Sequence, residues 1–242
     1  MKKILIGCEK SQAVCLEFRK RGFEAYSCDI QPCSGGHPEW HLQMDIFKAI
    51  NGGSSTILPG NVLKAQDGSE VYIGNGWDAA IFFPDCTYLT VTGNKWLKDQ
   101  PERKSGALVG QARRQARADA YEFFMALWNC GIPKIAMENP IGVMSTLWRK
   151  PDQIITPMMF GHVEPKKTCL WLKGFPKLKH THTGIEPEYH TTQSGKRMPK
   201  WYAYADKSKG QKERANIRSK TFSGIAEAMG DQWGKYLLEQ NQ

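Results

Sequence analysis

The sequence predicts an α/β fold built on a mostly parallel β-sheet. Short apolar segments alternate with segments of helical periodicity through the first half of the chain, a rhythm typical of a parallel sheet with helices on both faces. Polar residues follow directly after the apolar segments, where the carboxyl ends of parallel strands form binding sites. At 242 residues, 40% of them hydrophobic, the chain can bury one sizeable core with a small appended lobe.

The first half of the chain is divided into elements by its apolar spacing and its turn residues. Strands are expected where short apolar runs end in Gly, Pro, Asn or Asp, and helices where apolar residues recur every three or four positions. In chain order, the elements are a strand over 4–7, a helix over 11–22, a strand over 23–30, a short helical or extended piece over 45–50, a hairpin over 63–73, a strand over 77–83, a helix over 104–128 and a strand over 134–140.

The second half has a different pattern. Residues 154–155 and 167–172 are predicted strands, whereas residues 180–212 are basic, polar and broken by Gly and Pro. A helix over 221–238 closes the pattern. The predicted organisation is a core over residues 1–172 with an insertion at 51–76, a small basic lobe over 173–217 and a C-terminal helix that returns to the core over 218–242.

The charge of the chain favours a polyanionic partner. The formal net charge is +9, and such an excess attracts nucleic acid before it attracts a small neutral substrate. No apolar run approaches the roughly 20 residues that cross a bilayer. Residues 1–7 have too short an apolar core for a signal peptide, so we interpret them as a buried strand. We therefore expect a cytoplasmic protein with no membrane partner, in which most of the seven cysteines are reduced and buried.

A cysteine and a glutamate follow two of the predicted strands. Cys86 comes after the strand over 77–83, and Glu138 ends the strand over 134–140. A thiolate is the natural nucleophile for carbon 6 of a pyrimidine ring, and a carboxyl group facing the ring can stabilise nitrogen 3 and contact the exocyclic amine. We predict that these two residues face each other across one cleft and are catalytic.

The order of these motifs resembles that of the cytosine-5 DNA methyltransferases, and most closely the short form encoded by phages and prophages. The resemblance implies a Rossmann-like, class I S-adenosylmethionine-dependent methyltransferase fold in which the basic lobe recognises the substrate. It implies S-adenosyl-L-methionine as cofactor and duplex DNA with a flipped cytosine as partner. It also implies that Cys86 forms a covalent adduct while carbon 5 is methylated, with Glu138 at the base.

The resemblance extends to the cofactor-binding residues. Residues 7–9 are similar to the family's cofactor-binding turn, Asp29 to the acid that binds the ribose, and Asp45 to the start of the turn that holds the adenine. Residues near the C-terminus are similar to the last motif, which closes on the methionine part of the cofactor. The complete expected set is Gly7, Cys8, Glu9, Asp29, Ile30, Asp45, Ile46, Pro84, Ile225 and Ala226.

The expected substrate contacts come from three segments. Asn139 lies beside Glu138, and Lys95 belongs to the stretch that closes over the flipped base in the family. The family's Gln-Arg-Arg motif is absent, and residues 166–168 are its nearest equivalent, from which Lys167 and Thr168 are expected to contact the base and phosphate. Two alternatives remain open: a non-catalytic relative that binds nucleic acid, and methylation of RNA or a free cytidine nucleotide.

Other groups of residues have weaker patterns. Zinc could be bound at the spacing of Cys28, Cys33, His37 and His41, but Asp29 lies inside that set, so no metal is predicted. The loop histidines are interpreted as exposed, and three arginines of the long helix as either a phosphate-binding or a solvated face. A segment from Arg197 to Arg218 mixes aromatic and basic residues that suit stacking on bases. The loop histidines are His180, His182 and His190, and the arginines of the long helix are Arg113, Arg114 and Arg117. The aromatic residues of the segment are Trp201, Tyr202 and Tyr204.

Overall fold

The computed structural model describes residues 1–52, 62–200, 203 and 221–240. A seven-stranded sheet forms its centre, in the order β3-β2-β1-β6-β7-β9-β8. The strands are β1 (Lys3–Gly7), β2 (Glu24–Asp29), β3 (His41–Gln43), β6 (Ala79–Phe82), β7 (Ile135–Pro140), β8 (Gln153–Ile155) and β9 (Thr168–Lys173).

The sheet is mostly parallel, which confirms the predicted α/β class with a mostly parallel sheet. Strands β3, β2, β1, β6 and β7 run in the same direction, and among the described strands of this sheet only β9 runs in the opposite direction, antiparallel to both β7 and β8. Numbered along the chain, the first five strands have the order 3-2-1-4-5 of doubly wound α/β folds. The order reverses between β1 and β6, and ligands of such folds bind outside the carboxyl ends of the strands at that point.

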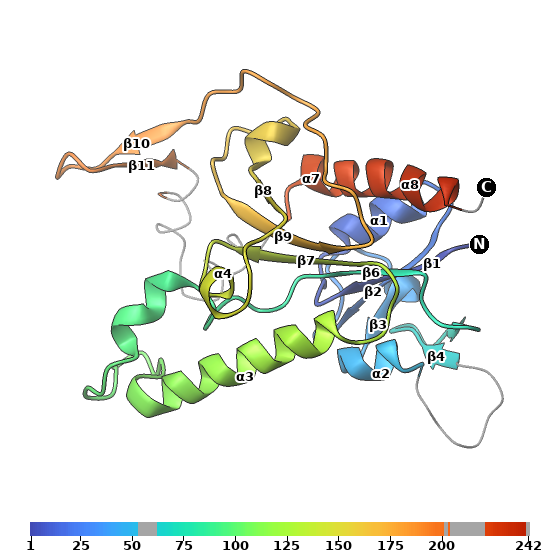
Figure 1. Ribbon diagram of the computed structural model, residues 1–242, viewed down its shortest axis with the longest axis horizontal. Helices are drawn as coiled ribbons and strands as arrows, with labels where there is room; N and C mark the ends of the chain where they lie inside the picture. Colours follow the sequence, from blue (N-terminus) through green and yellow to red (C-terminus); the bar gives the residue numbers. More distant parts are fainter. Residues whose placement is uncertain (53–61, 201–202, 204–220, 241–242) are drawn as a thin grey trace.

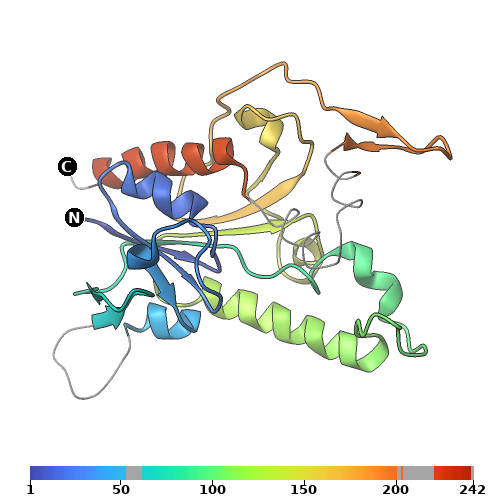
Figure 2. The same ribbon diagram turned by 180° about the vertical axis from the view of Figure 1, so that it is seen from behind.

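Helices cover both faces of the sheet (Figures 1 and 2). One face carries α1 (Ala13–Arg19), packed against the C-terminal helices, and the opposite face carries α2 (Ile46–Ile50) and α3 (Gly110–Trp128). The C-terminal region consists of α7 (Ser223–Ala228), a π-helical turn η4 (Met229–Trp233) and α8 (Gly234–Glu239). This region packs against α1.

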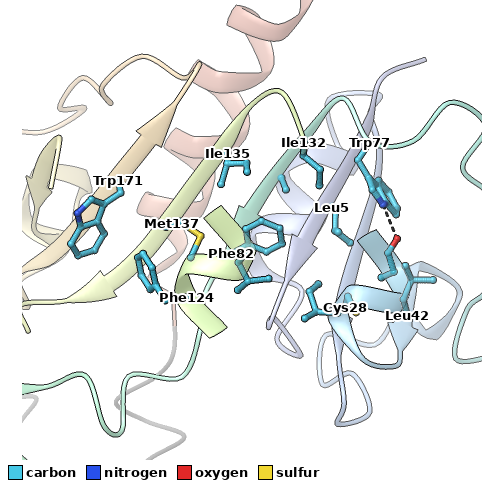
Figure 3. Packing of buried hydrophobic residues seen from close by; sticks show 14 of the residues in the cluster. Leu5, Cys28, Leu42, Trp77, Phe82, Phe124, Ile132, Ile135, Met137 and Trp171 are labelled. Atoms are coloured by element: carbon cyan, nitrogen blue, oxygen red, sulfur yellow. Dashed lines mark hydrogen bonds between the residues drawn. The ribbon is translucent and has the colours of Figure 1, made fainter. Parts of the chain in front are cut away.

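Two hydrophobic cores follow from the alternation of side chains along the buried strands. In β1, Leu5 joins the core beneath α3, whereas Ile4 and Ile6 join the core beneath α1 and α7. Figure 3 shows the first core, in which Phe82 and Met137 extend from neighbouring strands toward α3. The central strands are therefore buried on both faces, and only their ends are available for chemistry.

Shorter elements surround the sheet. The predicted hairpin is present as β4 (Val62–Lys64) paired with β5 (Glu70–Tyr72). A second hairpin, β10 (Tyr189–Thr191) with β11 (Arg197–Pro199), extends away from the sheet (Figure 1). Other short helices of the described residues are η1 (Pro38–Trp40), η2 (Val91–Trp96), α4 (Met144–Leu147) and η3 (Pro157–Phe160).

Two predicted helix boundaries are wrong. The long helix begins at Gly110 rather than at residue 104, because Gly106 and Gly110 have left-handed φ angles of 69° and 56° that break the helix. The C-terminal helix is interrupted by η4, where Gly230 lies against α1 so closely that an added Cβ would be 2.8 Å from Cβ of Glu17. Within the described residues, no helix is long and apolar enough to span a bilayer.

Candidate active site

The carboxyl ends of the central strands lie in register at one edge of the sheet. Gly7 is aligned with Cys28 of β2 and with Phe82 of β6, and Phe82 is aligned with Met137 of β7. The residues that follow the last paired residue of each strand therefore lie side by side at this edge of the sheet. This register brings together the ends of β1, β2, β6 and β7, where the predicted site residues are concentrated.

A buried hydrogen bond joins the ends of β6 and β7. The side-chain amide of Asn139 donates to the carbonyl oxygen of Pro84 over 2.8 Å. Asn139 is only 1% exposed, and Pro84 is also buried. Because an unpaired buried amide is costly, this bond fixes the segment that leads into Cys86 against the strand that carries Glu138.

A tight turn presents Cys86. The exposed carboxylate of Asp85 accepts hydrogen bonds from the backbone nitrogen and hydroxyl of Thr87, at 2.9 and 2.7 Å. The carbonyl oxygen of Cys86 accepts from the backbone nitrogens of Leu89 and Thr90, at 3.0 and 3.1 Å. The thiol is half-buried, so it is shielded but still reachable.

The surroundings of Cys86 favour the protonated thiol. Burial, followed by the negative charges of Asp85 and Glu138, raises its pKa to about 11, and the positive charge of Lys166 opposes this shift. The thiol is therefore mostly neutral near pH 7, and a nucleophilic role requires that a nearby group or the substrate complex removes its proton.

Glu138 is the second titratable group at this edge. Burial raises its pKa, while the Lys166 charge and a hydrogen bond with the Thr168 side chain oppose the shift. A carboxyl group with a raised pKa can carry a proton and donate it to a ring nitrogen. The Glu138 charge is also one of the causes that raise the pKa of the Cys86 thiol.

The cation of this site is Lys166, which the sequence interpretation passed over in favour of Lys167. The Lys166 charge acts on both Cys86 and Glu138, whereas the Lys167 side chain is exposed. Side chains two positions apart on an extended chain share a face. Thr168 faces Glu138, so Lys166 falls on the same side, and this alternation is the signal that could have identified it.

Three carboxylates surround the turn after β1. Burial and then the charges of Asp29, Asp85 and Asp45 raise the pKa of the Cys8 thiol to about 12. Cys8 itself has a left-handed φ of 59°, which turns the chain sharply at the strand end. Preceding it, Gly7 has no room for a side chain, since an added Cβ would be 2.5 Å from the Phe82 ring.

The acids after β2 and β3 each use one oxygen locally. Asp29 accepts a 2.9 Å hydrogen bond from the backbone nitrogen of Gln31, and Asp45 caps α2 by accepting from the backbone nitrogen of Phe47 over 2.9 Å. No hydrogen bond within the described residues uses their other carboxylate oxygens. Beside Asp29, the apolar side chain of Ile30 is 76% exposed, which suits contact with a flat apolar ligand surface.

Five of the residues that were expected to bind the cofactor have buried side chains. Glu9 is 4% exposed, and its carboxylate accepts hydrogen bonds from the backbone nitrogens of Val14 and Cys15, at 2.7 and 3.3 Å. Glu9 thus caps α1, and any ligand contact there would come from its main chain. The other four side chains are also buried: Ile46, Pro84, Ile225 and Ala226.

The comparisons with known proteins are sparse. No family model matches the sequence, and no curated protein matches it significantly. Among solved structures, the chain is similar to a candidate DNA modification methyltransferase encoded within a prophage of E. coli, with 12% identity and a TM-score of 0.40. The match covers 71% of this chain and 46% of the other, so the chain spans less than half of that protein. At this level the likeness establishes neither family nor function, which must be argued from the residues of the site.

The arginines of α3 have a role that neither sequence interpretation anticipated. Arg113 is 7% exposed and its guanidinium lies over the Tyr88 ring, so it is neither solvated nor open to phosphate. Arg117 donates to the carbonyl oxygens of Tyr88 and Thr90, at 2.8 and 3.3 Å. Arg114 donates to the carbonyl oxygen of Leu97 over 2.7 Å. All three bind the segment that follows Cys86 or border it.

Lys95 is exposed on that same segment. Its ammonium group lies 4.8 Å from the centre of the Trp96 ring, and the guanidinium of Arg103 lies 3.9 Å from the same ring centre. Two cations therefore share one aromatic ring at the surface. Next to the segment, a hollow of about 410 Å³ is lined by Asp85, Tyr88, Ala116, Asp119, Ala120 and Phe123.

The remaining residue groups are placed as follows. His41 is buried between the Ser27 hydroxyl and the carbonyl oxygen of Gln31, at 2.8 and 2.9 Å, and His37 stacks on Trp40. Among the described residues, no three His, Cys, Asp or Glu side chains are arranged to hold a metal ion. His182 contacts Thr181, and His180 lies near Phe160. Trp201, Tyr202 and Tyr204, with most of the predicted lobe beyond residue 200, lie outside the described residues.

Proposed function

We propose that this protein is an S-adenosylmethionine-dependent methyltransferase that methylates carbon 5 of cytosine in DNA, with Cys86 as nucleophile and Glu138 as the acid at the base. The observation that carries the proposal is the convergence of these two side chains at the carboxyl ends of adjacent parallel strands. A lone cysteine after a strand is common, but a half-buried thiol, a carboxyl group with a raised pKa and a lysine acting on both form a set with acid and nucleophile roles.

The residues at the β1, β2 and β3 ends fit the cofactor. Asp29 has an oxygen available for the ribose hydroxyls, and the exposed side chain of Ile30 offers an apolar surface for adenine. Asp45 presents a second carboxylate for the purine amine. The left-handed turn at Cys8 lies at the switch point where ligands of doubly wound folds bind. When bound, the cofactor supplies an electrophilic methyl group.

The chain's own residues account for activation of the base. The Cys86 thiolate forms a bond to carbon 6, and the displaced electron pair makes carbon 5 nucleophilic while Glu138 donates its proton to nitrogen 3. After methylation, nitrogen 3 returns its proton to Glu138, and loss of the carbon 5 proton to a base restores the carbon 5–carbon 6 double bond and expels the thiolate. Lys166 favours the thiolate, because its charge lowers the thiol pKa.

DNA is the substrate that the charge of the chain supports best. The net charge of +9 favours a polyanion. The surface pair of Lys95 and Arg103 around Trp96 adds cations and an aromatic ring near the segment that follows Cys86. We take the described hairpin β10–β11 as part of the proposed recognition lobe over residues 173–217, because it stands away from the sheet and carries Lys196 and Arg197. With this assignment, residues 1–172 and 218–242 form the proposed catalytic core.

The test is transfer of a radiolabelled methyl group from S-adenosylmethionine to duplex DNA, single-stranded DNA, RNA and cytidine nucleotides. DNA containing 5-fluorocytosine is expected to trap Cys86, because fluorine at carbon 5 cannot leave as a proton does. Cys86→Ser is expected to abolish both transfer and adduct. Cys130→Ser, which removes another half-buried thiol, at the far end of α3, is expected to retain both. An adduct on another cysteine would overturn the assignment.

A non-catalytic nucleic-acid-binding role is the second candidate. The observation that favours it is the raised pKa of Cys86, to which the adjacent Asp85 contributes. On this alternative, the protein binds cofactor and DNA but transfers no methyl group and forms no adduct with 5-fluorocytosine. Transfer confined to RNA or to nucleotides would instead retain the chemistry and change the substrate.

A further inference from the structure

The segment that follows Cys86 is fixed from the side of β7. The backbone nitrogen of Val143 donates to the carbonyl oxygen of Leu89 over 2.8 Å, and Thr90 forms a β-bridge with Gly142. An added Cβ at Gly142 would overlap the Leu89 carbonyl oxygen, so the two chains approach as closely as glycine allows. This side of the segment is therefore set by the backbone.

On the other side, one guanidinium binds the same turn. Arg117 donates from Nε to the carbonyl oxygen of Tyr88 over 2.8 Å, and from its terminal nitrogen to the carbonyl oxygen of Thr90 over 3.3 Å. The same nitrogen reaches the side-chain oxygen of Asn94 over 2.8 Å. A planar group with a fixed set of donors orients such acceptors better than a flexible ammonium does.

We propose that Arg117 is a positioning residue for the nucleophile: by holding the carbonyl oxygens of Tyr88 and Thr90, it fixes the direction of the Cα–Cβ bond of Cys86, from which the thiol extends. This inference rests on the proposed function. The main chain transmits the effect, because the carbonyl oxygen of Cys86 is itself bound by the backbone nitrogens of Leu89 and Thr90. The Cα–Cβ bond of Cys86 therefore cannot change direction without breaking these bonds or those of Arg117.

The role of Arg117 is geometric and not electrostatic. Among the described residues, the charges that shift the pKa of the Cys86 thiol are those of Asp85, Glu138 and Lys166, and Arg117 is not one of them. Loss of Arg117 should therefore slow the reaction without moving the pH at which the thiol ionises. Loss of Lys166 should move that pH. This contrast separates positioning from electrostatic activation.

The experiment compares Arg117→Ala and Arg117→Lys with Arg114→Ala in the full chain. Arg114 lies on the same helix, but it binds Leu97 and Asp99, farther along the segment from Cys86. Arg117→Ala is expected to lower kcat for duplex DNA about 10- to 100-fold, since a small misplacement of a reacting group costs about this much. KM and cofactor affinity should change by less than about threefold, and added guanidinium ion should restore part of kcat. Arg114→Ala should lower kcat by less than about threefold.

The outcomes are distinct. Equal kcat values for Arg117→Ala and Arg114→Ala, a shifted pH dependence of Cys86 alkylation by iodoacetamide, or no rescue by guanidinium would each overturn the inference. If Arg117→Ala does not fold, Arg117→Lys decides, because it keeps the charge and one of the bonds and should lower kcat by an intermediate factor. Failure of the unmodified protein to transfer methyl groups or to trap 5-fluorocytosine would instead overturn the proposed function, and the inference with it.

Discussion

Asn139 and Pro84 are joined across adjacent strands by a buried hydrogen bond of 2.8 Å from the side-chain amide to the carbonyl oxygen. The two residues lie next to the proposed acid and two positions before the proposed nucleophile, respectively. A single side chain thus ties together the two strand ends that carry the proposed chemistry. Its contribution can be measured separately from the chemistry itself.

Asn139→Ala is expected to lower the free energy of unfolding by about 1–3 kcal/mol, because the buried carbonyl oxygen of Pro84 loses its partner. Denaturant unfolding measures this change. Asn75→Ala, at an exposed turn position, serves as the control and should change stability by less than about 0.5 kcal/mol. A loss at Asn139 no larger than that at Asn75 would mean that the bond does not order the site.

Two substitutions near Cys86 should shift the pKa of its thiol in opposite directions. Asp85→Asn removes a charge that raises the thiol pKa, so alkylation of Cys86 at a fixed pH near 8 should become faster. Lys166→Ala removes a charge that lowers the pKa, so alkylation should become slower. The rate for the unmodified protein should rise steeply with pH, since its thiol pKa is raised to about 11. Mass spectrometry of the alkylated peptide gives the rates, and shifts of the same sign for both variants would contradict the electrostatic account.

Cofactor binding should depend on Asp29. S-adenosylmethionine or its demethylated product is expected to raise the melting temperature by mass action on the folded state. Asp29→Ala should weaken binding by about 1–3 kcal/mol, as expected for loss of hydrogen bonds to the ribose. Glu122→Ala is the matched control, because it also removes a carboxylate but at an exposed position of α3. This variant should bind the cofactor normally. The absence of any shift at saturating cofactor would contradict the proposed function.

Binding to DNA should weaken steeply with salt, because cations that contact phosphates release counterions. Affinities for several unrelated duplexes should fall together as the salt concentration rises, since most protein–DNA contacts go to the backbone. Lys95→Ala should reduce the slope of log affinity against log salt by about one unit if Lys95 contacts a phosphate. Lys20→Ala, on the exposed surface near α1, should leave the slope unchanged. Equal slopes for the two variants would remove Lys95 from the DNA-binding surface.

The strands and their polar ends could be predicted from the sequence because buried parallel strands are short apolar runs with visible terminators. The same reasoning predicted that Cys86 and Glu138 follow two neighbouring strands, and β6 and β7 are adjacent and parallel. It misjudged the start of α3, where glycines in left-handed conformations end the helical geometry although apolar spacing continues upstream. Local periodicity does not report such breaks.

Two residues of the candidate site, Lys166 and Arg117, were identified only from the structure. Lys166 and Lys167 are adjacent and chemically identical, and only the phase of the strand that follows decides which one faces Glu138. Arg117 binds backbone carbonyl groups, which every residue possesses, so no residue type in the sequence indicates its partners. Its spacing from Arg113 and Arg114 is typical of a solvated helix face, whereas Arg113 is in fact buried.

The antiparallel position of β9 has a consequence for the order in which the molecule can assemble. β9 follows β8 along the chain, but it lies between β7 and β8 in the sheet, and β8 pairs with no other strand of the described part of the chain. During synthesis, β8 therefore emerges without a partner and joins the sheet only when β9 inserts beside β7. Thr168 is the first residue of β9 and Lys166 lies two residues before it, so Glu138 acquires both neighbours in that same late step. A chain interrupted before β9 would contain the thiol and the carboxyl group but lack the cation and the hydroxyl that act on them.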